Sequence, residues 1–591
     1  MLKRLWHHLS KRRQKQFVLM QILIVIASFF EMASLGAVVP FLSVLAEPES
    51  VYQYKYLQPF IQFFEISEAS QLAMPITILF IALIILSAIV RLILLYAITR
   101  LSFSTGGELS INIYRHTLYQ DYSIHVTRNS SEVINGIITK TKTVTKGVIS
   151  PVLGLISTFV TIIGIISVLL LINISVTLTA FVRFGGLYLI VMHFTRGLLK
   201  ENSQLIADKS DLMVKSLQEG LEGIREVLIN NNQQFYLQLY RNSDLQMRQA
   251  SRKNEFIISS PRFGMEAIGI VIIALFAYAA TLNFGGIDQF LPILGVFVLG
   301  AQKLLPAIQK GYAGYSRIKG SKYSLIDVIS LLDQPIPDYA NLPAPTPNSF
   351  SKSIELKNLC FRYSKDSPWV LKNINLEIPK GSVIGIVGTT GCGKSTLVDV
   401  IMGLLSPTSG ELRVDNQLID SKNKRAWQAH ISNVPQHIFL SDSTIEENIA
   451  FGLPNEQIDH LRVKKAAQQA QIAELVERWE NGYQTLVGER GTKLSGGQRQ
   501  RVGVARAFYK ELDVLIFDEA TSALDDETEL AVMDAIEGFD RELTVIMIAH
   551  RLTTLKNCDK IVKFEKNYAT QILSYEEVMN LNRNTGDIDV E

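Results

Sequence analysis

Six long apolar stretches in the first 320 residues limit this chain to a fold that crosses a lipid bilayer. They lie near residues 17–46, 73–98, 148–172, 175–195, 256–282 and 289–318. Each is long enough to cross a hydrocarbon layer of about 30 Å as a helix. Only 19% of the residues are charged, whereas a soluble protein has about 25%. The sequence therefore predicts a polytopic α-helical membrane domain with six transmembrane helices.

The N-terminus is basic, with six Lys or Arg residues and no acidic residue in positions 1–16. A cleaved signal peptide is one explanation, but the apolar run that follows is longer than the roughly 7–15 residues of such a signal. Basic residues before the first span favour a cytoplasmic N-terminus. We therefore expect residues 1–16 to form an interfacial elbow helix, and six spans return the chain to the cytoplasm.

Composition divides the rest of the chain into three parts. Residues 17–332 form the predicted membrane domain, in which the charged segments 100–147 and 196–255 are expected to be cytoplasmic helices. Residues 333–350 contain five prolines, which predicts a semi-rigid linker. Residues 351–591 are then a second, water-exposed domain. The net charge of +2 gives no reason to expect nucleic acid as a partner, and three dispersed cysteines argue against a disulfide framework or a zinc site.

Cations inside predicted spans are unusual, because each costs at least about 2.5–3.5 kcal/mol to insert at the centre of a helix. Arg91, Arg262 and Lys303 are such residues. One hypothesis is that they line a polar cavity that receives an anionic group. The alternative is that they reach the interface or pair internally, as Arg262 and Glu266 would at a spacing of four on one helix.

The segment GTTGCGKST at 388–396 matches the phosphate-binding pattern G-x-x-x-x-G-K-[ST], after an apolar strand and before a helix. Such a loop turns backbone N–H groups toward phosphates, and the following helix N-terminus also attracts them. Lys394 is expected to reach the β- and γ-phosphates, and Ser395 to bind Mg²⁺. The predicted nucleotide-binding residues of this loop are Gly388, Thr389, Thr390, Gly391, Cys392, Gly393, Lys394, Ser395 and Thr396.

A second acidic motif, VLIFDEA at 514–520, completes the predicted hydrolytic site. Four apolar residues form a buried strand, and Asp518 at its end is placed to hold Mg²⁺ through its water shell. Glu519 would orient or deprotonate the attacking water. The two motifs together predict a nucleotide hydrolase with ATP and Mg²⁺.

The segment LSGGQRQR at 494–501 resembles the signature of ATP-binding cassette (ABC) proteins, and the resemblance extends over nearly the whole chain. It implies an α/β P-loop ATPase (ABC) domain after the membrane domain. It also implies roles for further residues. Tyr363 would stack on adenine, Gln436 would contact Mg²⁺, His550 would contact the γ-phosphate, Asp525 would belong to the D-loop, and Ser495, Gly496, Gly497 and Gln498 would contact the ATP held by a partner chain.

The same resemblance implies an exporter-type half-transporter that works as a homodimer with two composite ATP sites, although a heterodimer with a related chain stays open. Its nucleotide domain would lie in the cytoplasm and its spans in a bacterial inner membrane. Less specific similarities, in FFEMASLGAVVPFL at 29–42 and PRFGMEAIG at 261–269, resemble PglK-type flippases of lipid-linked oligosaccharides. They imply an amphipathic glycolipid substrate. Another amphiphile (lipid A, a drug or a peptide) and an ATP-gated channel or regulatory subunit are the alternatives.

Overall fold

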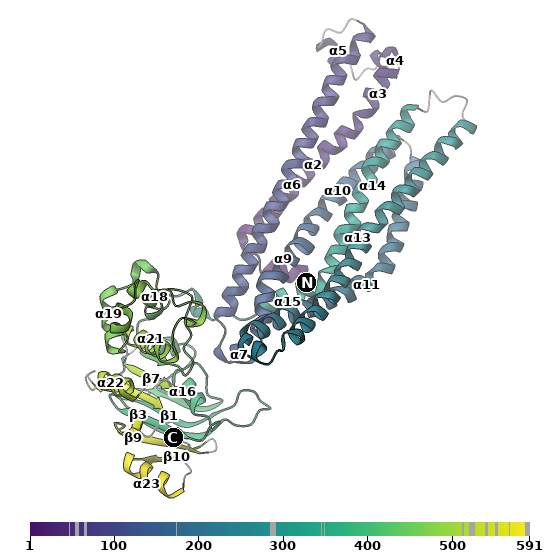
Figure 1. Cartoon of the computed structure of the whole chain (residues 1–591). Helices are drawn as coiled ribbons and strands as arrows, with labels where there is room; N and C mark the ends of the chain where they lie inside the picture. The colour runs from purple at the N-terminus through teal and green to yellow at the C-terminus, as the bar shows by residue number, and fades with distance from the viewer. Residues whose placement is uncertain are drawn as a thin grey trace. The chain divides into compact units, whose positions relative to one another are not determined.

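The computed structural model describes the chain except residues 47, 54–57, 64–67, 173, 284–290, 344, 348, 511–512, 519–525, 538–541, 550–552, 566–567 and 586–591. Some further residues inside helices and strands are described by their backbone alone, and Lys303 is one of them. The chain forms two compact units, Met1–Gln120 with Arg128–Ile336, and Asp121–Thr127 with Pro337–Glu591. They are called the membrane unit and the nucleotide unit below (Figure 1).

The nucleotide unit is built on two sheets. An antiparallel sheet has the order β2-β1-β4-β5, and a larger sheet has the order β10-β9-β3-β8-β7-β6. Strands β9, β3, β8, β7 and β6 pair in parallel, while β10 is antiparallel at one edge. The strands are β1 (Ser353–Phe361), β2 (Leu371–Pro379), β3 (Val383–Gly388), β4 (Ser409–Val414), β5 (Gln417–Leu418), β6 (Ile431–Val434), β7 (Val514–Asp518), β8 (Thr544–Ile548), β9 (Lys560–Glu565) and β10 (Tyr568–Leu573).

Short helices surround these sheets. The strand predicted before the phosphate loop is confirmed as β3, and the strand predicted before Asp518 is confirmed as β7. The helices are α7 (Tyr122–Thr127), α16 (Lys394–Ile401), α17 (Lys424–Gln428), α18 (Ile445–Ile449), α19 (His460–Gln469), α20 (Ala473–Glu477), α21 (Gly496–Tyr509), α22 (Asp526–Glu537) and α23 (Tyr575–Thr585). The 3₁₀ turns are η4 (Asp338–Asn341), η5 (Asn455–Gln457), η6 (Gly482–Gln484), η7 (Glu489–Gly491) and η8 (Thr553–Leu555).

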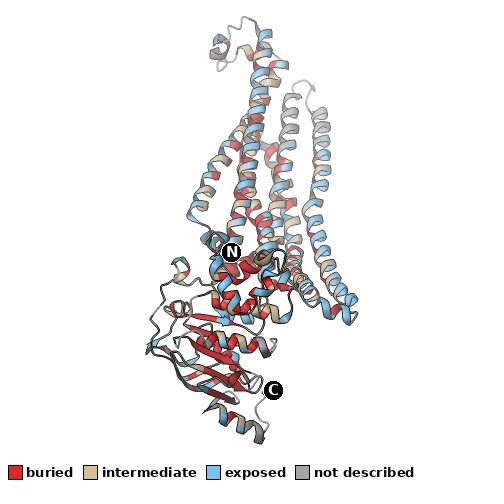
Figure 2. Cartoon of the chain, turned by 60° about the vertical axis from the view of Figure 1, so that its left-hand side comes forward, coloured by how far each residue is buried: buried red, intermediate tan, exposed pale blue. Residues whose placement is uncertain are grey.

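The larger sheet is buried on both faces, which explains why its strands are almost continuously apolar. Alternate residues of β7 enter different cores: Ile516 packs with α16 and the antiparallel sheet, whereas Leu515 and Phe517 pack with α18, α19 and α21. Figure 2 shows these central strands as the most deeply buried part of the nucleotide unit. Because the parallel strands are fixed from both sides, their carboxyl ends form one rigid edge.

The membrane unit is entirely helical in its described residues, and its long helices continue well beyond the length of a bilayer span. The α-helices are α1 (Leu2–His7), α2 (Lys11–Gly36), α3 (Val38–Ala46), α4 (Pro48–Tyr52), α5 (Gln58–Phe63), α6 (Ala73–Leu118), α8 (Ser130–Asn135), α9 (Thr141–Val144), α10 (Ser150–Ile172), α11 (Ile174–Glu222), α12 (Ile224–Ile229), α13 (Gln233–Asn283), α14 (Leu291–Gly320) and α15 (Lys322–Leu332). One 3₁₀ turn, η1 (Ala69–Leu72), and two π-helical turns, η2 (Gly136–Lys140) and η3 (Thr145–Ile149), connect them.

Three of the predicted spans meet the length and hydropathy of a membrane helix within the described residues. They lie in Lys11–Leu45, Ala69–Leu118 and Ser130–Leu171. The other three predicted spans fall in α11, α13 and α14, parts of which are described by their backbone alone. The predicted cytoplasmic segments 100–147 and 196–255 are helical, as expected, because α6, α11 and α13 run on into them.

Packing in the membrane unit joins α2 to α6 and α10, α10 to α14, and α11 to α13. Ile24 and Leu153 are fully buried where α2 meets α10. By contrast, only 11% of the most apolar window of Ala69–Leu118 is buried. Water would disfavour this much exposed apolar surface, so α6 suits contact with lipid.

A buried lysine ties together three helical segments of the membrane unit that lie outside the most apolar stretches. Lys140, at the end of η2, is 5% exposed, and its ammonium lies 2.6 Å from carboxylate oxygens of both Asp211 and Asp327. Asn135 adds a hydrogen bond of 2.7 Å to Asp211. One cation therefore neutralises a carboxylate from α11 and a carboxylate from α15. Without the lysine, each carboxylate would be a partly buried charge that lacks a counter-ion.

We predict that Lys140→Met lowers the stability of the protein, because it leaves two partly buried carboxylates facing an apolar side chain. Removal of one partner of a buried ion pair costs roughly 3–5 kcal/mol, and the partial exposure of both carboxylates puts this site at about 2–3 kcal/mol. The midpoint of thermal unfolding in detergent is the measurement. Lys142→Met, at an exposed lysine two residues away, is the control, and equal midpoints for the two variants would contradict the prediction.

Candidate functional site

The candidate site is the loop between β3 and α16, where the chain leaves the rigid edge of the larger sheet. Gly388 ends β3 with φ of 154°, and a Cβ there would lie 2.2 Å from the carbonyl oxygen of Phe564. Gly393 has φ of 105°, and a Cβ there would lie 3.0 Å from the carbonyl oxygen of Val370. Only glycine fits these positions without strain, so the loop conformation is fixed by its own sequence, by strand β9 and by the residue that precedes β2.

The predicted phosphate ligand Lys394 and the predicted Mg²⁺ ligand Ser395 are the first two residues of α16, directly after this loop. Lys394, the first residue of α16, is 6% exposed and donates hydrogen bonds from Nζ to the carbonyl oxygens of Gly388, at 2.5 Å, and Thr389, at 3.4 Å. Ser395 Oγ lies 3.5 Å from Oδ1 of Asp518 at the end of β7. Strand β3, which leads into α16, and strand β7 therefore bring the Ser395 hydroxyl and the Asp518 carboxylate together from distant parts of the sequence.

The remaining members of the loop pack or face solvent. Cys392 is 4% exposed, and burial raises the pKa of its thiol, so it is a packing residue rather than a reactive one. Thr396 Oγ1 lies 3.2 Å from the phenol oxygen of Tyr363. Tyr363 is 41% exposed, and its ring meets Phe361 edge to face at 5.1 Å. The predicted adenine platform is thus an accessible aromatic ring joined to the phosphate loop.

The short helix α7 belongs to the nucleotide unit, although in the sequence it lies between two predicted spans. Lys424 Nζ forms an ion pair with the carboxylate of Asp121 at 2.7 Å. Burial raises the pKa of Tyr122, and the charges of Asp399 and Tyr363 add to this. A segment of the predicted cytoplasmic loop 100–147 therefore lies close to the predicted adenine platform.

Asp399, on α16, is a residue of this site that sequence reasoning missed. Burial raises its pKa to about 6, and the nearby charge of Asp518 contributes. Its spacing of four from Ser395 places both on one face of α16. That spacing was visible in the sequence, but the approach of Asp518 depends on the pairing of β7 within the sheet.

The predicted signature residues form the start of α21. Ser495 is the N-cap, and its Oγ accepts a hydrogen bond from the backbone N–H of Gln498 at 3.3 Å. The Gln498 side chain accepts one from the backbone N–H of Ser495 at 2.9 Å. This capping box leaves the hydroxyl proton of Ser495 available as a donor at the exposed N-terminus of α21. Gly496 and Gly497 follow as its first helical residues.

The other predicted residues of the nucleotide site divide into described and undescribed positions. Gln436 is exposed, two residues after β6 ends. Glu519, Asp525 and His550 lie outside the described residues.

The structure gives both predicted arginines in the spans a carboxylate partner. Arg91 on α6 lies 3.4 Å from Glu31 on α2, and Thr161 on α10 donates to Glu31 at 3.3 Å. Arg262 pairs with Glu266 at 2.9 Å on α13, which is the internal pair considered as the alternative. The two arginines belong to separate ion pairs, and the side chain of Lys303 lies outside the described residues.

Comparison with known proteins decides the family. Residues 371–522 match the ABC transporter domain, and residues 17–293 match the ABC transporter transmembrane region. The Bacillus subtilis "putative multidrug export ATP-binding/permease protein YgaD" is 30% identical over 82% of this chain and 81% of that protein. The chain belongs to the ABC transporters.

Further similarities are to a flippase and to an exporter. An "ATP-dependent lipid A-core flippase" of Saccharophagus degradans is 28% identical over 80% of this chain and 79% of that protein. The solved structure of a bacterial Atm1-family ABC exporter with ATP bound matches with a TM-score of 0.78 at 23% identity, over 97% of each chain. The chain is a half-transporter, with one membrane and one nucleotide domain, whose ATPase drives transport and whose architecture implies a dimer. The predicted fold class is confirmed.

We predict that Asp399→Asn makes the transporter more stable at pH 8. The pKa of Asp399 in the folded protein is about 6, above the ordinary value of 3.8. The folded state thus holds a proton that the unfolded chain has released, so the aspartate reduces stability progressively as pH rises through this range. The variant should unfold a few degrees higher at pH 8, with a smaller gain at pH 5.

Thermal unfolding of the full-length transporter, in EDTA and without nucleotide, measures this difference. Asp366→Asn, at an exposed aspartate, controls for the loss of one negative charge. A gain that is the same at both pH values would show that burial of the Asp399 charge is not its cause.

Proposed function

We propose that this transporter is a flippase that moves a lipid-linked oligosaccharide or related glycolipid across the bacterial inner membrane, as a homodimer with two composite ATP sites. The observation that carries the proposal is the pair Arg91–Glu31, in which a half-exposed cation within a predicted span lies 3.4 Å from a mostly buried carboxylate. A charge within a span is expensive. A cargo with an anionic group among apolar chains would use it. The lipid A-core flippases among the relatives act on a glycolipid by name.

In each ATP site, residues of one chain hold the nucleotide and residues of the other close over it. Tyr363 stacks on adenine, Lys394 contacts the β- and γ-phosphates, and Ser495 of the partner subunit donates its hydroxyl to the γ-phosphate. Glu519 orients and deprotonates the attacking water, and His550 contacts the γ-phosphate. Asp525 and Gln436 connect the site to the partner and to the membrane domain.

The oxygens of Ser395 and Asp518, 3.5 Å apart, fit a hard divalent cation, because Mg²⁺ prefers oxygen ligands. Mg²⁺ bound there would neutralise phosphate charge. Asp399 lies behind this pair and keeps the site electronegative when it is ionised.

The cargo site works by exchange of one anion for another. Glu31 neutralises Arg91 between cycles, and a phosphate or pyrophosphate group of the cargo replaces it. A guanidinium suits this exchange, because its planar N–H groups bind such oxyanions in pairs. Arg262 and Lys303 supply further cations on α13 and α14, with Arg262 held by Glu266 in the same manner.

Transport of a lipid-linked oligosaccharide into proteoliposomes tests the function. We expect ATP-dependent flipping in the wild type and a loss of about a hundredfold or more in Glu519→Gln, which lacks the general base. Active ATP hydrolysis without flipping would show that the cargo is a different amphiphile. A drug is then the second candidate, because the Bacillus subtilis relative is a putative multidrug exporter.

We predict opposite effects from the two halves of the Arg91–Glu31 pair. Arg91→Ala should raise, by about tenfold, the glycolipid concentration that half-maximally stimulates ATP hydrolysis, because a cationic hydrogen-bond donor for the anionic group of the cargo is lost. Glu31→Gln should lower it, because the competing carboxylate is gone. Arg100→Ala, at an exposed arginine of the same helix, is the control. Equal effects of Arg91→Ala and Arg100→Ala would contradict a cargo site at Arg91.

A further inference from the structure

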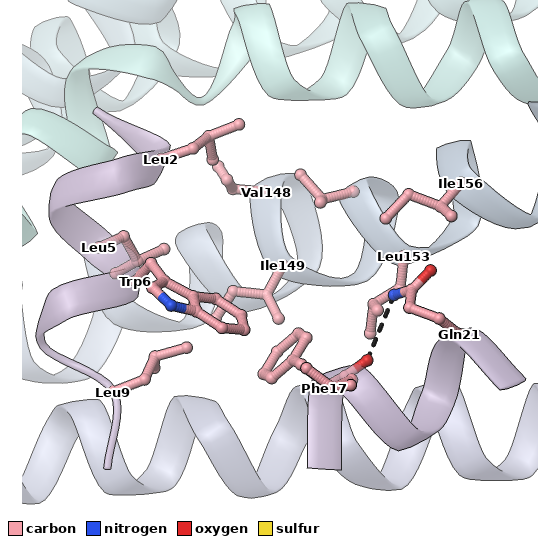
Figure 3. A pocket seen from close by; sticks show the side chains of 12 residues that line it. Leu2, Leu5, Trp6, Leu9, Phe17, Gln21, Val148, Ile149, Leu153 and Ile156 are labelled. Atoms are coloured by element: carbon pink, nitrogen blue, oxygen red, sulfur yellow. Dashed lines mark hydrogen bonds between the residues drawn. The ribbon is translucent and has the colours of Figure 1, made fainter. Parts of the chain in front are cut away.

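The membrane unit contains an apolar cavity of about 230 Å³ beside its first helix. Figure 3 shows side chains of α1 facing those of η3 and α10 across it, with Phe17 and Gln21 of α2 at its side. The lining residues are Leu2, Leu5, Trp6, Leu9, Phe17, Val18, Gln21, Val148, Ile149, Val152, Leu153 and Ile156. It is distinct from the Arg91–Glu31 pair, because neither residue lines it.

The cavity has an apolar floor and an open rim. Leu153 is fully buried, and Leu5 and Leu9 are 6% and 7% exposed. Gln21 is the one lining residue with a polar side-chain amide, and it donates to its own helix, to the carbonyl oxygen of Phe17 at 3.3 Å. At the rim, Val18 is 60% exposed and Leu2 is 46% exposed. Apolar cavities of roughly 150 Å³ already stay dry and accept small hydrocarbons, so this one suits a segment of an alkyl chain.

The segment that carries α1 and the start of α2 is rich in cations. Within the described residues, Arg4 pairs with Asp333 and Arg13 with Glu108. The other four cations of the N-terminus are exposed and have no partner among the residues that the structure describes. They are Lys3, Lys11, Arg12 and Lys15.

The helical spacing brings two of these cations to the cavity. Lys11, Lys15 and Val18 are separated by four and three residues, so they share one face of α2. The apolar rim at Val18 is therefore continuous with a cationic patch one to two turns toward the N-terminus. No acidic residue precedes Glu31 in the sequence, and the carboxylates that reach this segment from elsewhere, Glu108 and Asp333, pair with Arg13 and Arg4.

We propose that this cavity binds one acyl chain of an anionic glycerophospholipid, whose headgroup phosphate lies on Lys11 and Lys15. The apolar cavity would hold the acyl chain, and the two lysines would bind the negatively charged headgroup. Basic pockets at the cytoplasmic ends of membrane helices bind anionic headgroups in this manner. The cavity is too small for a drug-sized ligand, which needs about 300 Å³ or more. The bound lipid is a resident of the bilayer and not the cargo.

Fluorescence quenching of Trp6 tests the proposal on the full-length dimer in nanodiscs. Trp6 lines the cavity, and the other three tryptophans of the chain, Trp369, Trp427 and Trp479, belong to the nucleotide unit. The probe is phosphatidylglycerol with brominated acyl chains, added in increasing fraction to phosphatidylcholine. Trp6→Phe gives the signal that does not come from the cavity. The discs contain no glycolipid, so the result is independent of the proposed cargo.

We expect quenching that saturates at a few mole per cent of brominated phosphatidylglycerol, while brominated phosphatidylcholine needs about tenfold more. In K11Q/K15Q this preference should fall about tenfold. K464Q/K465Q removes two exposed lysines from α19 of the nucleotide unit and should change nothing. Equal quenching by the two lipids in the wild type, or an unchanged preference in K11Q/K15Q, would overturn the proposal.

A second variant tests the position of the chain. Val152→Phe narrows the cavity and should abolish saturable quenching, whereas Ile163→Phe, at an exposed position of the same helix, should not. Full saturable quenching in Val152→Phe would place the acyl chain outside the cavity and overturn the proposal. The lysine variants leave the core intact, so the test stands if Val152→Phe does not fold.

Discussion

Parallel pairing of β3, β8 and β7 is the constraint on which the nucleotide unit depends. It fixes Gly388 and Asp518 at the same edge, although 130 residues separate them in the chain. Apolar cores on both faces prevent either strand from shifting. The phosphate loop therefore inherits its position from the sheet and its shape from its glycines. The same arrangement brings Asp399 of α16 near Asp518, and burial together with the charge of Asp518 raises the pKa of Asp399.

Local geometry decides how much of this site the sequence predicts. The strand, loop and helix around Lys394 are specified by a few adjacent residues, and they were expected from the motif alone. The capped start of α21 at Ser495 is also local, although Ser495 was expected only as a nucleotide contact, from the resemblance to ABC proteins. The nearness of Asp399 to Asp518 was not expected, because it arises from strand order. Likewise, α7 was expected only as part of a cytoplasmic loop, since nothing in its six residues indicates that it clusters with the nucleotide unit.

In the membrane unit, the prediction of helices succeeded because apolar length alone requires them: a backbone in hydrocarbon must satisfy its own hydrogen bonds. The ion-pair partners of the charged residues in the spans were harder to predict. The pair Arg262–Glu266 follows from spacing within one helix, whereas Arg91 meets Glu31 only because α2 packs against α6. The apolar cavity beside α1 has the same origin, since two stretches distant in sequence, residues 2–21 and 148–156, create a space that neither encodes separately.

The contact of Arg4 with Asp333 sets an order of events during synthesis. These residues are 329 positions apart, and His8 also meets Asp333, at 2.7 Å. Ribosomes add about 5–20 residues per second, so α1 waits at least roughly 16–66 s before its partner exists. Until then the first helix is held by apolar contacts of Leu5 and Leu9 with segments that are made earlier, in α6 and η3. The ion pair at the end of α15 therefore completes a contact that apolar packing begins, and truncation before Asp333 leaves Arg4 and His8 without this partner.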